Sequence, residues 1–74
     1  MTRLDSYECR RLLGTAIFES RTKQGLSLRR FAAMVGIDYT HLFDIEHGRS
    51  SATIDLLVKI ANGLDVSVKD LIEF

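Results

Sequence analysis

Three residues with metal-ligating side chains, His41, Asp44 and His47, recur at intervals of three in this 74-residue chain. Adjacent helical turns bring such residues together, and imidazole with carboxylate is a ligand set that zinc accepts. A helix turns about 100° per residue, so each interval covers about 300° and the three residues share only a loose face. We therefore predict a polar face that meets water or a partner, with no bound metal and no other cofactor.

The sequence shows no arrangement typical of catalysis. No nucleophile stands with a general base and an orienting group, and no glycine-rich loop is suited to cradle phosphate. The single cysteine, Cys9, excludes an internal disulfide and a thiolate zinc finger, and we interpret it as a free thiol rather than a redox sensor. These features predict a protein that is not an enzyme.

The polar face lies on the second of two short helices predicted within residues 26–48. Ser27 and Asp38 each follow an apolar residue and stand where a side chain accepts a hydrogen bond from the first helical turn. Gly36 and Gly48 stand where a left-handed residue ends a helix. A short turn between the helices fits a steep crossing. The inward positions are apolar: Leu28, Phe31, Ala32, Val35, Leu42 and Ile45.

A long first helix is predicted before this pair. Asp5 and Glu8 provide an acidic start, Gly25 provides the stop, and residues 1–5 are expected to fray. The helix therefore ends at about Gln24.

Two more helices are predicted after the pair. Thr53 caps a fourth helix whose apolar stripe is too broad for one covered face, which predicts a central helix. Ser67 and Asp70 form the start of a short fifth helix over residues 68–73. The stripe of the fourth helix comprises Ile54, Leu57, Val58, Ile60, Ala61 and Leu64.

With this spacing, the chain resembles the phage-repressor or Cro-type helix-turn-helix family, also called the xenobiotic-response-element family. The resemblance covers about residues 12–72. It implies an all-α, five-helix lambda-repressor-like domain over residues 1–74, with the helix-turn-helix at the second and third helices and residues 1–10 as an N-terminal extension of the first. The matching residues are Leu13, Gly14, Ile17, Arg21, Leu26, Ser27, Phe31, Ala32, Gly36, Ile37, Leu42, Ile45, Glu46, Gly48, Ile54, Leu57, Lys59, Ile60, Ala61, Leu64 and Val66.

The resemblance implies a transcriptional regulator that binds double-stranded operator DNA, with the second helix of the motif in the major groove. It also implies a buried structural ion pair between Arg21 and Glu46. The implied base-facing residues are Tyr39, Thr40, Phe43 and Asp44. The implied phosphate contacts, of which Arg49 is the strongest candidate, are Ser27, Arg29, Arg30, His47, Arg49, Ser50 and Ser51.

Three residues depart from the family pattern on this face. Leu28 stands where relatives commonly have glutamine, and Phe43 stands where a small polar residue is usual. Asp44 repels phosphate unless it accepts a hydrogen bond from a cytosine amino group. The departures leave open a second function, an antitoxin-like protein-interaction module in which Leu28, Tyr39 and Phe43 form an apolar docking patch.

The distribution of charged and apolar residues indicates which partners the chain could bind. The net charge is zero, but residues 1–49 hold eight of the ten basic residues. The last eleven residues carry more apolar surface than one small core covers, which predicts a homodimer. No signal peptide or long apolar run is present, so we expect a cytoplasmic protein without membrane or small-molecule effector. The expected dimer residues are Leu64, Val66, Val68, Leu71, Ile72 and Phe74.

Overall fold

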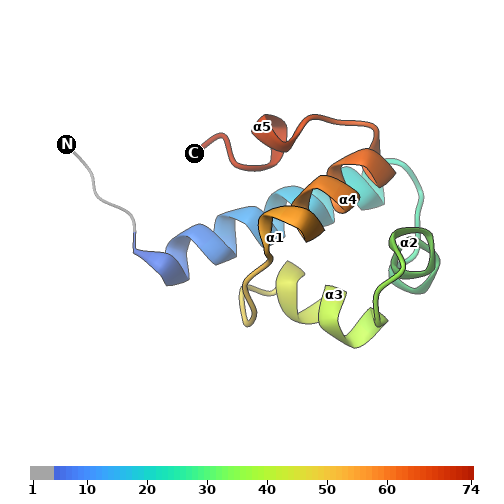
Figure 1. The fold of residues 1–74 in the computed structure, drawn as a ribbon, viewed down its shortest axis with the longest axis horizontal. Coiled ribbons are helices and arrows are strands. Elements are labelled where there is room, and N and C mark those ends of the chain that lie inside the picture. The colour runs from blue at the N-terminus through green and yellow to red at the C-terminus, as the bar shows by residue number, and fades with distance from the viewer. Residues whose placement is uncertain (1–4) are drawn as a thin grey trace.

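The computed structural model describes residues 5–74, which form five α-helices and no strand. The helices are α1 (Ser6–Lys23), α2 (Leu28–Val35), α3 (Tyr39–Glu46), α4 (Ile54–Leu64) and α5 (Val68–Leu71). The long α1 contacts α3, α4 and α5, while α2 packs against α3 and α4 near one end of α1 (Figure 1). The prediction of an all-α, five-helix domain is confirmed.

Each helix begins at the capping residue that the sequence predicts. Every one of these side chains accepts a hydrogen bond from a backbone N–H in the first turn of its helix, which satisfies a donor that the helix leaves unpaired. Asp5 is therefore ordered as the cap of α1, and the predicted fraying of the preceding residues lies outside the described part of the chain. The caps are Asp5, Ser27, Asp38, Thr53 and Ser67.

The predicted fifth helix is too long. The structure ends α5 at Leu71, because Ile72 leaves the helical conformation (φ −117°) and the Phe74 N–H turns back to donate to the Ile72 carbonyl at 2.9 Å. At its start, Asp70 Oδ2 accepts a hydrogen bond from the Ser67 N–H at 3.0 Å. This bond lowers the pKa of the Asp70 carboxyl, so its stabilising effect is lost as the pH falls through that lowered pKa.

The core forms where α1, α2, α3 and α4 meet. Phe31, Leu42 and Ile45 are completely buried, as the sequence predicts for the inward faces of α2 and α3. The α4 helix contacts α1, α2 and α5, as expected of a central helix, but its apolar stripe is not fully covered, since Ile54 and Val58 are 67% and 43% exposed. The core residues are Leu13, Ile17, Phe31, Ala32, Val35, Leu42, Ile45, Leu57, Ile60, Ala61, Leu64 and Leu71.

Two of the expected dimer residues belong to this core. Leu64 and Leu71 are only 1% and 2% exposed, because they fill the contact between α4, α5 and the helices beneath them. Their assignment to a dimer surface is therefore wrong. Ile72 and Phe74 are exposed, and the remaining members of the predicted set, Val66 and Val68, are partly buried against the core.

Candidate nucleic-acid interface

The outer face of α3 is positioned by a direct backbone contact between α3 and α1. A Cβ atom placed on Gly14 of α1 would overlap the carbonyl oxygens of Ile45 and Glu46, and would lie 2.7 Å from the carbonyl carbon of Glu46. Glycine is thus the residue that lets the last turn of α3 rest on α1. This contact fixes which face of α3 points away from the molecule.

A buried ion pair fixes the same end of α3. Arg21 Nε donates to Glu46 Oε2 at 2.7 Å, and Arg21 Nη2 donates to Glu46 Oε1 at 2.9 Å. A third bond runs from Arg21 Nη1 to the Leu26 carbonyl at 2.7 Å, so the guanidinium also ties down the loop between α1 and α2. Both charged residues are 7% exposed. The pair implied by the resemblance is present, and it joins α1 to α3.

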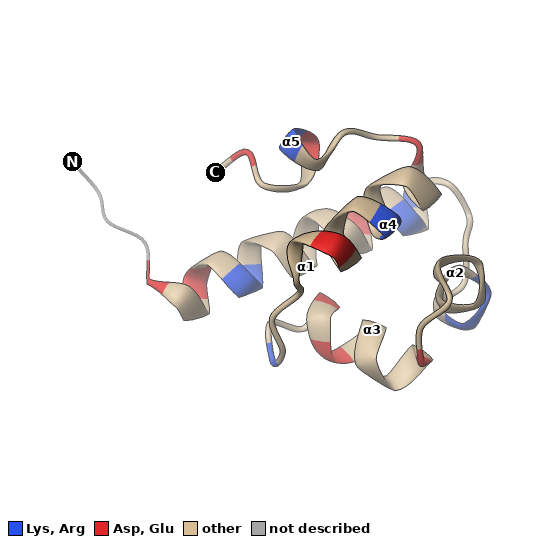
Figure 2. Cartoon of the chain, in the orientation of Figure 1, with Lys and Arg blue, Asp and Glu red and all other residues tan. Residues whose placement is uncertain are grey.

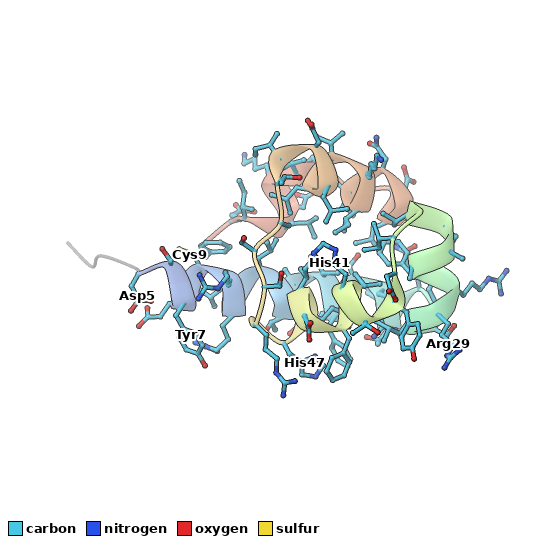
Figure 3. All side chains as sticks on the ribbon, turned by 60° about the horizontal axis from the view of Figure 1, so that its bottom comes forward. Asp5, Tyr7, Cys9, Arg29, His41 and His47 are labelled. Carbon is cyan, nitrogen blue, oxygen red and sulfur yellow. The ribbon has the colours of Figure 1, made fainter. Side chains whose placement is uncertain are left out.

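Aromatic rings occupy the outer face of α3. Tyr39 and Phe43 are exposed and four residues apart, which places them on successive turns of one face. The ring of His47 stacks on that of Phe43, with 3.9 Å between centroids and 25° between planes. Figure 3 shows His41 and His47 on different sides of α3, and within residues 5–74 no three metal-ligating side chains cluster.

Arginines lie beside two of these rings. The guanidinium carbon of Arg29, from the first turn of α2, is 4.4 Å from the ring centroid of Tyr39. The guanidinium carbon of Arg49, from the loop after α3, is 5.7 Å from the ring centroid of Phe43. Both distances lie within the range of a cation–π interaction. Figure 2 shows the basic segments of α2 and of the α3–α4 loop on either side of α3.

The backbone around Arg49 is held in place. Gly48 is buried with a positive φ of 72°, and the Arg49 N–H donates to the Asp44 carbonyl at 2.8 Å. Arg10 of α1 donates from Nε to the Gly48 carbonyl at 3.5 Å. The sequence gives no sign of this contact, because 38 residues separate the two positions.

Comparison with known proteins identifies the motif. The family described as Helix-turn-helix, HTH_3, matches residues 17–71. The chain belongs to the HTH_3 helix-turn-helix family. This is a family of DNA-binding transcription regulators of the Cro/C1 type, so the family predicted from the sequence is confirmed.

Individual HTH_3 proteins resemble the chain over most of its length. It is 41% identical over 56 residues to the HTH-type transcriptional regulator SutR of Escherichia coli K12, a match that covers 76% of this chain and 32% of SutR. The restriction-modification controller protein C.AhdI from Aeromonas hydrophila superposes with a TM-score of 0.82 at 27% identity, over 84% of this chain and 94% of that one.

The clp gene regulator ClgR from C. glutamicum superposes with a TM-score of 0.85 at 29% identity, over 88% of this chain and 83% of that one. The chain thus spans about a third of SutR but most of the two solved regulators. Among the helices of residues 5–74, none is both long enough and apolar enough to cross a membrane.

In this HTH_3 chain, α2 and α3 are the helix-turn-helix, and the predicted contact residues fall into three groups around α3. Thr40, Tyr39 and Phe43 are exposed on α3, while Asp44 is partly buried. One group of predicted phosphate contacts lies at the start of α2 and the other around the α3–α4 loop. These groups are Ser27, Arg29 and Arg30, and then His47, Arg49, Ser50 and Ser51.

Leu28 does not join the exposed face. It is partly buried and packs against the core, whereas Tyr39 and Phe43 are exposed. In the apolar docking patch expected for a protein-interaction module, Leu28 is thus less exposed than the other two residues.

Proposed function

We propose that this protein regulates transcription by binding operator DNA as a homodimer, with α3 of each subunit in the major groove. The observation that carries the proposal is the placement of arginines from α2 and from the α3–α4 loop on either side of an exposed α3. A duplex offers phosphates on both sides of its major groove, so basic groups on both sides of a reading helix suit it. A protein with this function works in the cytoplasm.

The α3 side chains would supply the sequence preference. Thr40 presents a hydroxyl that can donate or accept and a methyl group that can contact the methyl of thymine. Asp44 can accept a hydrogen bond from a cytosine amino group, which offsets its repulsion by phosphate. The Ser27 hydroxyl accepts from the Arg30 N–H and still has its own hydrogen to donate to a backbone phosphate, whereas the Thr40 N–H at the start of α3 is already bonded to Asp38 Oδ1.

The main test is fluorescence-anisotropy binding to the DNA upstream of the protein's own coding sequence and to an unrelated duplex, each at two salt concentrations. We expect preferential binding to the first duplex that weakens steeply with salt, because each neutralised phosphate releases counterions. Replacing Arg49 with alanine is expected to weaken binding to both duplexes and to reduce the slope of log K against log salt by about 1.8, because a dimer loses two phosphate contacts.

Lys59→Ala is the matched control, because it removes one exposed positive charge from α4, and it should leave the salt slope unchanged. A complex that is indifferent to salt, survives Arg49→Ala and is lost with Phe43→Ala would contradict DNA binding. That result would instead support the protein-interaction module.

The homodimer is supported by exposed apolar residues on α4 and after α5. Val58 and Ile54 are exposed on α4, and Ile72 and Phe74 are exposed near the end of the chain. A domain of this size gains stability from covering such surface in an assembly. A two-fold dimer would place two α3 helices about one DNA turn apart.

Val58→Asp is expected to convert the dimer to a monomer, because burying a carboxylate without a partner is costly. Sedimentation velocity gives the oligomeric state directly. Met34→Asp is the control, since it places the same charge on another exposed apolar residue, on α2, and should leave the dimer intact. A Val58→Asp protein that remains dimeric would exclude this surface as the interface.

A further inference from the structure

We propose that Tyr39 and Phe43 are positioning residues for DNA binding, each holding one arginine in place for a phosphate. Tyr39 would hold Arg29 at the start of α3, and Phe43 would hold Arg49 at its end. The inference rests on the proposed function, and it assigns to these two rings a role other than contact with base edges.

The first pair joins the two helices of the motif. Arg29 lies in the first turn of α2 and Tyr39 is the first residue of α3, yet the guanidinium carbon lies 4.4 Å from the ring centroid. Ser27 caps α2 by accepting from the Arg30 N–H at 3.1 Å, which fixes the backbone of that turn. The long side chain of Arg29 is therefore the flexible part, and the ring restrains it.

The second pair joins α3 to the loop that follows it. The guanidinium carbon of Arg49 is 5.7 Å from the ring centroid of Phe43, and the backbone of Arg49 is fixed by the hydrogen bond to Asp44 and by buried Gly48. The ring of Phe43 is itself restrained by its 3.9 Å stack with His47. Arg29 and His47 appear toward opposite ends of α3 in Figure 3.

The rings of Tyr39 and Phe43, four residues apart on α3, thus each lie beside one arginine, and the two arginines come from α2 and from the α3–α4 loop. This accounts for an aromatic residue at position 43, because a small polar side chain has no ring face for the Arg49 guanidinium to lie over. A guanidinium beside a ring keeps the N–H donors along its edge available for phosphate oxygens, which bind them in a fork. If the ring already restrains the arginine side chain in the free protein, less conformational entropy is lost when DNA binds.

A double-mutant cycle in the full-length chain tests the second pair, with the anisotropy assay and both duplexes described above. Phe43→Leu keeps an apolar side chain but removes the ring, and we expect it to weaken DNA binding about two- to fivefold for each subunit that contacts the duplex. The salt slope should not change, because no charge is lost. In the Arg49→Ala background, Phe43→Leu should have no further effect on affinity.

Conservative variants separate stacking from folding. Phe43→Tyr retains the ring and should bind as the wild type does, while Arg49→Lys retains the charge but loses the planar group and should weaken binding by about the same factor as Phe43→Leu. For the first pair, Tyr39→Leu combined with Arg29→Ala forms the equivalent cycle. Tyr39→Phe is its conservative variant, because it retains the ring. Thermal unfolding of each variant reports any change in the fold.

Two results would overturn the inference alone. The first is that Phe43→Leu leaves DNA affinity unchanged. The second is that Phe43→Leu weakens binding equally with and without Arg49. This second result would mean that the ring contacts DNA directly or only supports the fold. If the wild type binds neither duplex at low salt, the proposed function fails and this inference fails with it. If the wild type binds DNA but the paired residues show no coupling, only the inference fails and the proposed function stands.

Discussion

Replacing Glu46 with alanine is expected to lower the free energy of unfolding by about 3–5 kcal/mol. The substitution removes both carboxylate oxygens that Arg21 contacts, at 2.7 and 2.9 Å, and leaves the Arg21 side chain, 9% exposed, with one hydrogen bond, to the Leu26 carbonyl, and with the Phe18 ring centroid 5.3 Å from its guanidinium carbon. A domain of this length has a total stability of about 4–11 kcal/mol, so the loss is a large part of it. Urea denaturation followed by far-UV circular dichroism measures the change.

Two controls identify the cause as an uncompensated buried charge. Glu19→Ala removes a carboxylate from an exposed position on α1 and should change stability by less than about 0.5 kcal/mol. The double substitution Arg21→Met with Glu46→Leu removes both charges and should be much more stable than Glu46→Ala, because no unpaired ion remains buried. A Glu46→Ala protein within about 1 kcal/mol of the wild type would contradict the role assigned to the pair.

The helix starts could be predicted because their signals are local. A cap such as Ser27 or Thr53 bonds to an N–H three residues later, so the whole interaction lies within one short stretch of sequence. The ends were harder to predict. Asp65 ends α4 with a positive φ of 58°, although it is not glycine, and nothing in the sequence indicates it.

The width of the buried face of α4 could not be predicted from the sequence. Apolar spacing shows which residues share a face, but the covered part depends on where other helices pack, which is a long-range property. Ile54 and Val58 continue the apolar spacing of the core residues, yet no helix of the described chain covers them. The converse holds for Leu64 and Leu71, which the sequence predicts at a dimer surface but which pack in the core.

In the candidate site, too, local features could be predicted from the sequence and long-range contacts could not. The sequence indicates that Tyr39 and Phe43 share a face, because their spacing follows from helix geometry. It does not indicate that Arg29 and Arg49 lie beside those rings, since the pairing depends on the turn between α2 and α3 and on the path of the α3–α4 loop. The Arg21–Glu46 pair, 25 residues apart, was found only through the resemblance to a family.

Gly14→Ala is expected to destabilise the fold by about 3 kcal/mol or more, the upper end of the range for overpacking. Alanine is intrinsically better than glycine in a helix by about 1 kcal/mol, so propensity alone predicts a more stable protein. The added Cβ, however, would overlap the carbonyl oxygens of Ile45 and Glu46. These are backbone atoms and cannot rotate away as a side chain can, so the whole of α3 must move from α1.

Thermal unfolding should therefore show a fall in Tm of more than about 10 °C for Gly14→Ala, while Thr15→Ala at the next, exposed position of α1 leaves Tm nearly unchanged. A Gly14→Ala protein that melts with or above the wild type would show that α1 and α3 are not in direct backbone contact. Because α3 carries the proposed reading face, folded Gly14→Ala protein should also discriminate less between operator and unrelated DNA.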